Sequence, residues 1–211
     1  MKLYFIRHGQ TDWNVIRRLQ GQVEIPLNEF GEELARKTGE GLKDIPFAAC
    51  YTSPLGRAKR TAELILEGRD VEIIEDPRLL EMSFGIYEGR NLTDTEDQGL
   101  KNYREGFNHP EKYIAPEGGE TYQALMKRTK AFLDDLVNIL DYQDKNVMIT
   151  THGVALASLL TIIKGNALKD FWQVGVHKNC GVTCVEVAGG TYKILFENQV
   201  YYEEEVEDWH V

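Results

Sequence analysis

The chain has 211 residues, of which 42% are hydrophobic, enough to bury the core of one domain. Its 24 Lys and Arg against 34 Asp and Glu give a formal net charge of −10, which argues against a general surface for nucleic acids or anionic membranes. No stretch approaches the roughly 18 apolar residues of a membrane-spanning helix, and the apolar run at the N-terminus is too short for a signal peptide. We therefore expect one cytoplasmic domain, in which an anionic ligand would need a local cationic pocket.

The three cysteines are an odd number in a chain of this size, which argues against a disulfide framework. Cys50, Cys180 and Cys184 are therefore predicted to be reduced, buried thiols. The last two do not form a convincing pair of metal ligands.

The first third of the chain alternates short β-branched runs with amphipathic ones. This pattern predicts a strand at 2–6, a helix at about 29–43 capped by Asn28, a strand at 48–52, a helix at 55–66 and a strand at 71–75. This alternation of strands and helices is typical of a parallel sheet with crossover helices.

The second half continues the pattern after an interruption. Thr121 is predicted to cap a long helix, followed by a strand at 146–151, an apolar helix at 153–163, and strands at 182–187 and 192–196. The whole favours an α/β fold whose mainly parallel sheet is covered by helices on both faces. Between about 84 and 118 the periodicity breaks down, which indicates a partly helical insertion over the edge of the sheet. The acidic tail from Tyr201 is interpreted as a solvated end rather than a partner-binding segment.

Two histidines each follow a predicted strand and precede a glycine: His8 and His152. In open α/β sheets, ligands bind outside the carboxyl ends of the strands, and Gly153 opens a helix whose first amides favour an anion. Arg57 lies in the first turn of another such helix. With Arg7, it would form a cationic nest suited to a phosphate dianion, because each guanidinium can donate two parallel hydrogen bonds.

The segment LYFIRHGQTDWN at 3–14 resembles the signature of the histidine phosphatase superfamily, also called the phosphoglycerate mutase-like family. Four further stretches match in order: RLQGQVEIPLNEFG at 18–31, YTSPLGRAKRTA at 51–62, LLEMSFGIYEG at 79–89, and TTHG at 150–153. The resemblance covers most of the chain outside the insertion and the tail. It implies one domain over 1–211, a three-layer α/β/α sandwich with a helical lid at about 84–118, and phosphohistidine chemistry.

The resemblance also implies roles for five residues. His8 would be the nucleophile, Arg7, Arg57 and His152 the phosphate clamp, and Glu81 the general acid and base. A neutral imidazole can attack phosphorus while two arginines and a protonated second histidine neutralise the phosphoryl oxygens. The charge of the ester favours protonation of Glu81, which then protonates the leaving alkoxide and later deprotonates water. Such a cluster needs no metal and no other cofactor.

Other positions are expected to support this site. Those that match substrate-binding positions, lining the phosphate or ordering the loop over it, are Asn14, Gln20, Gly21 and Gly153. Thr11 is expected to cap the helix after the first loop, and Ser53 to support a phosphate-binding arginine. The remaining polar candidates match no catalytic position: His109, His177, His210 and Glu88.

The predicted partner is a small phosphate ester, and hydrolysis is favoured over transfer. The stretch after Glu81, EMSFGIYEGR, lacks the basic-aromatic segment and longer insertion typical of mutases that depend on 2,3-bisphosphoglycerate. The alternatives are such a mutase and a catalytically inactive phosphate-binding module, although every charged position of the motif is filled. The residues predicted for the lid are Lys101, Tyr103, Arg104 and Phe107, which point only to a small polar or aromatic group with some negative charge. Neither the substrate nor the oligomeric state is predicted.

Overall fold

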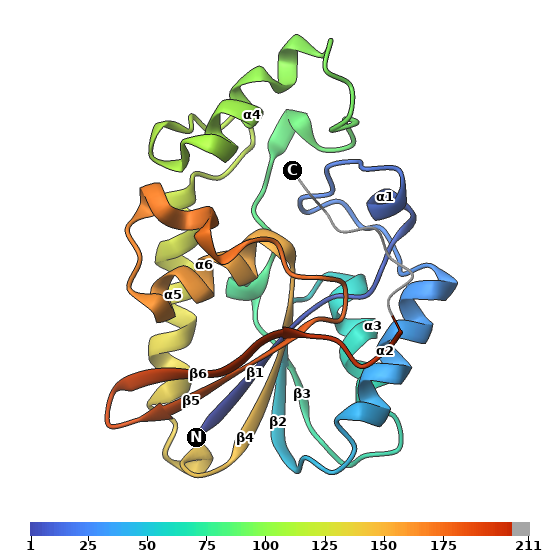
Figure 1. Ribbon diagram of the computed structural model, residues 1–211, viewed down its shortest axis with the longest axis vertical. Coiled ribbons are helices and arrows are strands. Elements are labelled where there is room, and N and C mark those ends of the chain that lie inside the picture. Colours follow the sequence, from blue (N-terminus) through green and yellow to red (C-terminus); the bar gives the residue numbers. More distant parts are fainter. Residues whose placement is uncertain (204–211) are drawn as a thin grey trace.

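In the computed structural model, which describes residues 1–203, six strands form one sheet in the order β3-β2-β4-β1-β5-β6 (Figure 1). The strands are β1 Lys2–Arg7, β2 Phe47–Thr52, β3 Ile73–Glu75, β4 Asn146–Thr151, β5 Val182–Ala188 and β6 Thr191–Gln199. The first four run parallel to their neighbours, whereas β5 is antiparallel to β1 and β6 to β5. The predicted mainly parallel sheet is confirmed. The predictions for His210 and for the acidic tail beyond Glu203 lie outside the described residues.

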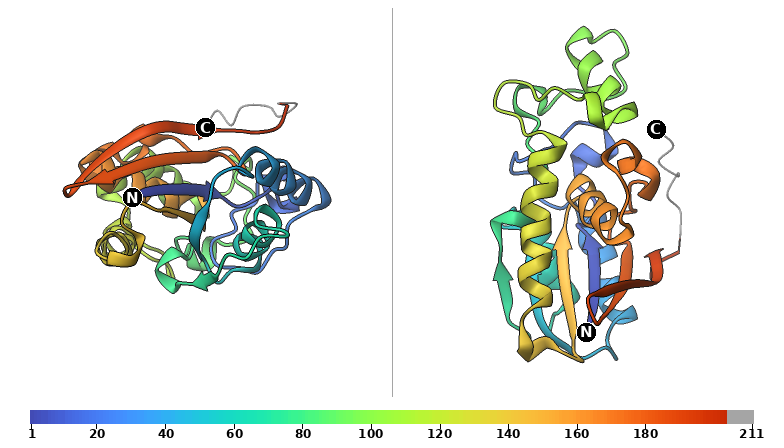
Figure 2. Two further views of the ribbon diagram at one scale, coloured as in Figure 1. Left: turned by 90° about the horizontal axis from the view of Figure 1, so that it is seen from below. Right: turned by 90° about the vertical axis from the view of Figure 1, so that its left-hand side faces the viewer.

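The helices cover both faces of this sheet (Figure 2). They are α1 Asp12–Val15, α2 Glu29–Gly41, α3 Gly56–Ile65, α4 Lys101–Asn108, α5 Tyr122–Val137 and α6 Gly153–Lys164. Alternate residues of β1 point to opposite faces: Leu3 and Phe5 belong to the core that includes α5 and α6, and Tyr4 and Ile6 to the core that includes α2 and α3. The two cores confirm the predicted three-layer sandwich.

Local hydrogen bonds explain where the helices begin. The side chain of Asn28 accepts from the main-chain N–H of Gly31 at 2.8 Å, and that of Thr121 accepts from Ala124 at 3.1 Å. Thr11 caps α1 in a reciprocal arrangement with Asn14. All three predicted caps are confirmed.

The third strand is shorter than predicted. Residues 71–75 were expected to form it, but the strand begins at Ile73. The main-chain N–H of Val71 donates to the carbonyl of Arg69 in a turn, so it cannot also join the β-ladder.

The three cysteines are free and buried, as predicted. No helix within residues 1–203 combines the length and apolar character needed to cross a membrane.

The segment from Phe84 to Gly118 lies beyond the carboxyl ends of the parallel strands (Figure 1). It contains α4 and short 3₁₀ turns, including Gln98–Leu100 and Pro110–Lys112. Its two stems pair with each other: Glu120 N donates to Ser83 O at 2.8 Å, and Ile86 N donates to Glu117 O at 3.2 Å. The insertion is thus anchored next to Glu81.

The loop that leaves β1 presses against the first turn of α2. A Cβ added to Gly9 would lie 2.5 Å from the carbonyl oxygen of Gly31, and one added to Gly31 would lie 2.1 Å from that of Gln10. Both contacts are with main-chain atoms, which cannot rotate away. Two facing glycines therefore allow the loop after His8 to lie this close to α2.

We predict that Gly31→Ala lowers the free energy of unfolding by about 1–3 kcal/mol, because overpacking against fixed main chain outweighs the gain in helix propensity. Urea unfolding would measure the change. Glu33→Ala, on an exposed position of the same helix, is the control and should alter stability by no more than about 0.5 kcal/mol. Equal stabilities of the two variants would contradict this account of the loop.

Candidate active site

The two candidate histidines meet because their strands are neighbours. β1 and β4 are parallel and in register, with Arg7 opposite Thr151, so the residues that follow, His8 and His152, emerge at the same edge. The main-chain N–H of His8 donates to Thr151 O at 2.9 Å, and the two imidazole ring centres are 5.2 Å apart. The predicted shared crevice is present.

His8 is held as a neutral imidazole of defined tautomer. Its Nδ1 lies 2.7 Å from the carbonyl oxygen of Gly9. A carbonyl can only accept, so Nδ1 carries the hydrogen and Nε2 carries the lone pair. Burial lowers the pKa of His8 well below its ordinary value, and the nearby Arg57 and Arg7 lower it further. The ring is therefore available as a nucleophile at neutral pH.

Both candidate arginines are buried and held by main-chain carbonyls. Arg7 Nη1 donates to His177 O at 2.6 Å, and Arg57 donates to Gly21 O at 2.6 Å and to Val23 O at 2.8 Å. Within residues 1–203, the Nε atoms of both guanidinium groups are buried without a hydrogen-bond partner. Burial lowers the pKa of both side chains, and the charge of Glu81 opposes that shift. Two buried cations that act on the charge of His8 thus keep donors without a partner among the described residues.

His152 adds a third unsatisfied donor or acceptor. Its Nε2 lies 2.7 Å from Ser53 Oγ, while its Nδ1 is buried without a partner among the described residues. If the serine hydroxyl donates to Nε2, Nδ1 carries a hydrogen that can be donated to an oxyanion. Ser53 therefore supports the histidine, and the prediction that it supports a phosphate-binding arginine is wrong.

The prediction of a protonated His152 concerns the protein with a bound phosphate and stays a prediction, while in the protein without an anion the charged ring is disfavoured. Its pKa is lowered well below the ordinary value, first by burial and then by the charge of Arg57. Three arginines and the ring of His8 all disfavour a positive charge on His152. A bound dianion would reverse this balance.

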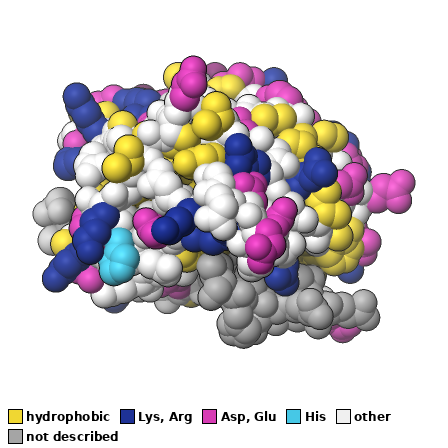
Figure 3. All heavy atoms as spheres, turned by 90° about the horizontal axis from the view of Figure 1, so that it is seen from above, with side chains coloured by type: hydrophobic (Ala, Val, Ile, Leu, Met, Phe, Trp, Pro, Cys, Tyr) yellow, Lys and Arg dark blue, Asp and Glu magenta, His cyan; other side chains and the backbone are white. Residues whose placement is uncertain are grey.

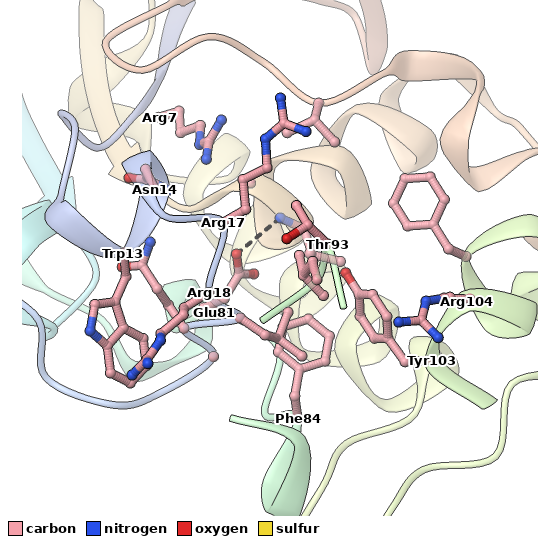
Figure 4. Close-up of a pocket in the computed structure, with 18 of the residues that line it drawn as sticks. Arg7, Trp13, Asn14, Arg17, Arg18, Glu81, Phe84, Thr93, Tyr103 and Arg104 are labelled. Atoms are coloured by element: carbon pink, nitrogen blue, oxygen red, sulfur yellow. Dashed lines mark hydrogen bonds between the residues drawn. The ribbon is translucent and has the colours of Figure 1, made fainter. Parts of the chain in front are cut away.

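Glu81 lies at the N-terminus of α6. Its Oε1 accepts from the main-chain N–H groups of Met82 and Ala155, both at 2.9 Å, and its Oε2 accepts from Val154 at 3.1 Å. Oε2 has the fewer hydrogen bonds and keeps a lone pair for a proton. In Figure 4, Glu81 lies between Arg7 and Asn14 on one side of the cavity and Phe84 and Tyr103 on the other.

The predicted binding residues surround this cluster. Asn14 and Gln20 are buried and line the cavity, and Gln20 Oε1 has no partner within residues 1–203. Gly21 has a φ of +54° and no room for a Cβ, because the carboxylate of Glu88 would lie 2.0 Å away. Gly153 also lines the cavity. Glu88 accepts main-chain hydrogen bonds from Gln22 and Phe84, a structural role that agrees with its exclusion from the catalytic candidates.

The cavity above the cluster, with a volume of about 640 Å³, is much larger than a phosphate group. Three of the four predicted lid residues, Tyr103, Arg104 and Phe107, line it. Lys101 does not: its exposed ammonium group lies 3.9 Å from Glu105. The sequence analysis missed several lining residues: Trp13, Arg17, Arg18, Leu92, Thr93, Trp172 and Val176.

Two of these residues, Arg17 and Arg18, add positive charge to the cavity. The stretch after Glu81 lacks the basic-aromatic segment typical of the mutases, yet these two cations of the cavity come from the loop after α1. Arg18 lies within one of the matched stretches, which was a usable signal. Figure 3 looks onto this end of the molecule and shows basic, acidic and hydrophobic side chains intermixed, so the cationic cluster is a local feature of the cavity.

The other polar candidates lie elsewhere. His109 forms a local pair with Glu111, at 3.7 Å, and His177 is buried with its Nε2 2.6 Å from Thr183 Oγ1. Asn179, which sequence reasoning missed, donates to the carbonyl of His8 at 2.9 Å. Within residues 1–203, no three His, Cys, Asp or Glu side chains are grouped so as to hold a metal ion.

Comparisons with known proteins identify the family of the chain. The family model described as "Histidine phosphatase superfamily (branch 1)" matches residues 3–200. The chain is 36% identical over 191 residues to the Cronobacter sakazakii protein named "Probable phosphoglycerate mutase GpmB", covering 88% of this chain and 85% of that protein. Among solved structures, Bacillus stearothermophilus YhfR superposes with a TM-score of 0.88 at 34% identity, covering 94% of this chain and 97% of that one. The alpha-ribazole phosphatase from Shigella flexneri gives 0.83 at 29%, covering 94% and 96%.

The burial of His177 predicts a measurable loss of stability in acid. Burial lowers its pKa from the ordinary value of about 6.5 to about 4. Below pH 6.5 the unfolded chain binds a proton at this residue that the folded protein does not bind until about pH 4, so stability falls as the pH falls through this interval. The shift corresponds to about 3 kcal/mol.

We expect urea unfolding between pH 8 and pH 4 to show a smaller acid-induced loss of stability for His177→Gln than for the wild type. Glutamine cannot bind a proton in either state, so this part of the pH dependence disappears. Parallel stability curves for the two proteins would show that the environment of His177 does not lower its pKa.

Proposed function

Because the chain belongs to the histidine phosphatase superfamily, we propose that it is an enzyme that transfers the phosphoryl group of a small phosphate monoester first to His8 and then to water. One observation supports this most strongly. Near the neutral imidazole of His8, the buried Nε atoms of Arg7 and Arg57 and the Nδ1 of His152 have no hydrogen-bond partner among residues 1–203. Buried polar groups are rarely left unsatisfied, and a phosphate dianion would satisfy all three.

The charges favour an anion at this position. At about 4 Å and an effective dielectric constant near 20, each pair of unit charges contributes on the order of 4 kcal/mol before desolvation. Two guanidinium groups already held by carbonyls need little reorganisation when the ester binds. His152 gains a proton most readily once the dianion is present.

In the first half-reaction, Nε2 of His8 attacks phosphorus as the bond from phosphorus to the ester oxygen breaks. The proton on Glu81 passes to the leaving oxygen, so an alcohol departs and a phosphohistidine remains. In the second, water attacks phosphorus, its proton returns to the Glu81 carboxylate, and the bond from phosphorus to nitrogen breaks to release inorganic phosphate. Glu81 ends each cycle as it began.

The alternative is transfer to a second acceptor, as in a phosphoglycerate mutase. The name of the Cronobacter sakazakii relative favours it, as do Arg17 and Arg18 in the cavity, which offer cations to a second acidic group. Hydrolysis is favoured by the size of the cavity, which leaves room for water beside a small ester, and by the phosphatase named among the structural relatives.

We predict that His8→Ala abolishes turnover, whereas His152→Ala leaves a trace, because only the first removes the nitrogen that bonds to phosphorus. Brief incubation of the wild type with labelled ester, quenched without acid, should leave alkali-stable, acid-labile phosphate on the protein. The control is His109→Ala, whose exposed ring lies outside the cavity and whose loss should leave turnover unchanged. Activity retained in His8→Ala, or label on a serine, would refute the assignment.

The choice between hydrolysis and transfer is tested with 3-phosphoglycerate, with and without 2,3-bisphosphoglycerate. We expect inorganic phosphate without need for the bisphosphate, because water reaches the phosphohistidine in a cavity of this size. Both free phosphate and 2-phosphoglycerate should be measured. Rapid isomerisation with negligible phosphate release would establish the mutase instead.

A further inference from the structure

Arg128 lies behind Glu81, on α5, and is not among the residues that line the cavity. Its side chain is only 20% exposed, and that of its partner Glu120 only 17%. A charged side chain that is largely withdrawn from solvent and lies outside the cavity must be bound by other groups of the protein. Its hydrogen bonds show which groups these are.

All five N–H groups of the Arg128 guanidinium are used. Nε and Nη2 donate to the two carboxylate oxygens of Glu120, both at 2.8 Å. Nη1 donates to the carbonyls of Arg78 and Leu80 at 2.8 and 2.7 Å, and Nη2 also donates to that of Glu81 at 3.0 Å. Lysine has three donors without a fixed planar arrangement, so it cannot reproduce this set.

The same main chain is fixed from two more directions. Gln22 Nε2 donates to the carbonyl of Glu81 at 2.9 Å, so that oxygen accepts two hydrogen bonds. The carboxylate of Glu81 accepts from the amides of Met82, Val154 and Ala155. Arg128 therefore determines where the residue's main chain lies, and the start of α6 determines where its carboxylate points.

We propose that Arg128, oriented by Glu120, is a positioning residue that fixes Glu81 for proton transfer to the leaving group. The inference rests on the proposed function of Glu81. Within residues 1–203, the hydrogen bonds of Arg128 reach Glu81, its neighbours and Glu120, and none reaches His8 or a phosphate-binding arginine. Its charge also lowers the pKa of His152, but Arg128→Lys keeps that charge and therefore tests the hydrogen bonds to Glu81. Displacement of a proton donor by about 1 Å can cost up to about 10²-fold in rate.

Glu120 also links this contact to the insertion. Its main-chain N–H donates to Ser83 O, and Gly119 pairs with Phe84, so the carboxylate that orients Arg128 comes from the second stem of the segment over the cavity. The second stem thus binds the main chain at Ser83 and Phe84, while Arg128 binds that of Arg78, Leu80 and Glu81.

The test compares two esters of similar size that differ in their need for an acid. Phenolate, with a pKa near that of tyrosine at about 10, leaves far more readily when protonated, whereas 4-nitrophenolate leaves well without a proton. For Arg128→Lys, we expect the first-turnover rate of His8 phosphorylation to fall at least about 10-fold with phenyl phosphate and less than about 3-fold with 4-nitrophenyl phosphate. KM for both esters should change little, because the phosphate-binding groups are intact.

Two further variants calibrate the result. Glu81→Gln should give the largest difference between the esters, and Arg128→Lys should lie between it and the wild type. Arg69→Lys is the matched control: Arg69 also donates to main-chain carbonyls, those of Leu42 and Ile45, but far from Glu81, so this variant should leave the ratio of the two rates unchanged.

An unchanged ratio in folded Arg128→Lys, or an equal loss with both esters, would overturn the positioning role. If that variant does not fold, Glu120→Gln, which keeps the arginine and weakens its orientation, replaces it, and an unchanged ratio there has the same meaning. Failure of the proposed function looks different: either the wild type forms no phosphohistidine, or Glu81→Gln itself leaves the ratio unchanged. In both cases the inference about Arg128 fails with it.

Discussion

The site depends on the parallel pairing of β1 with β4. Because Arg7 lies opposite Thr151, one strand pair delivers an arginine and two histidines to a single point at the edge of the sheet. A shift of β1 by one residue would turn its own side chains, including Arg7, to the other face of the sheet and away from His152. The hydrophobic alternation of β1 prevents such a shift, since Leu3 and Phe5 belong to one core and Tyr4 and Ile6 to the other.

Burial determines the protonation of the two histidines and the polarity around the two arginines of the site. Desolvation favours neutral imidazoles at His8 and His152 in the free protein. The guanidinium groups of Arg7 and Arg57 donate to carbonyls, but among the described residues their buried Nε atoms have no partner. An anion that enters meets preorganised donors in a medium of low polarity, where each interaction is stronger than in water. The same desolvation costs stability, which the packing of the surrounding three-layer fold offsets.

Glu81 illustrates how a loop residue is given the rigidity that proton transfer requires. Glu81 lies outside the helices and strands. Its carboxylate nevertheless accepts hydrogen bonds at the start of α6, and its carbonyl accepts them from Gln22 and Arg128. The insertion starts and ends at the same place, through the contact between Glu120 and Ser83. The segment that covers the cavity and the proposed general acid therefore share their anchoring residues.

The sequence alone determined the fold class, the order of the elements, the helix caps at Asn28 and Thr121, and the set of residues matching the family motif, because periodicity and local hydrogen bonding are written into neighbouring residues. It could not show that Ser53 contacts His152, that β3 begins late, or that Arg17, Arg18 and Trp172 line the cavity. The contact of Ser53 and the lining of the cavity depend on segments far apart in the chain, whereas the late start of β3 follows from a local turn between Arg69 and Val71. Nor could the sequence show that the pKa of His152 is lowered in the protein without an anion, because that pKa is set by burial and by charges from other elements, and only the tertiary structure brings Arg57 near that ring. Arg128 is the clearest example of what the sequence could not show. Its five hydrogen bonds reach residues up to 50 positions away, and no pattern in the neighbouring sequence predicts them.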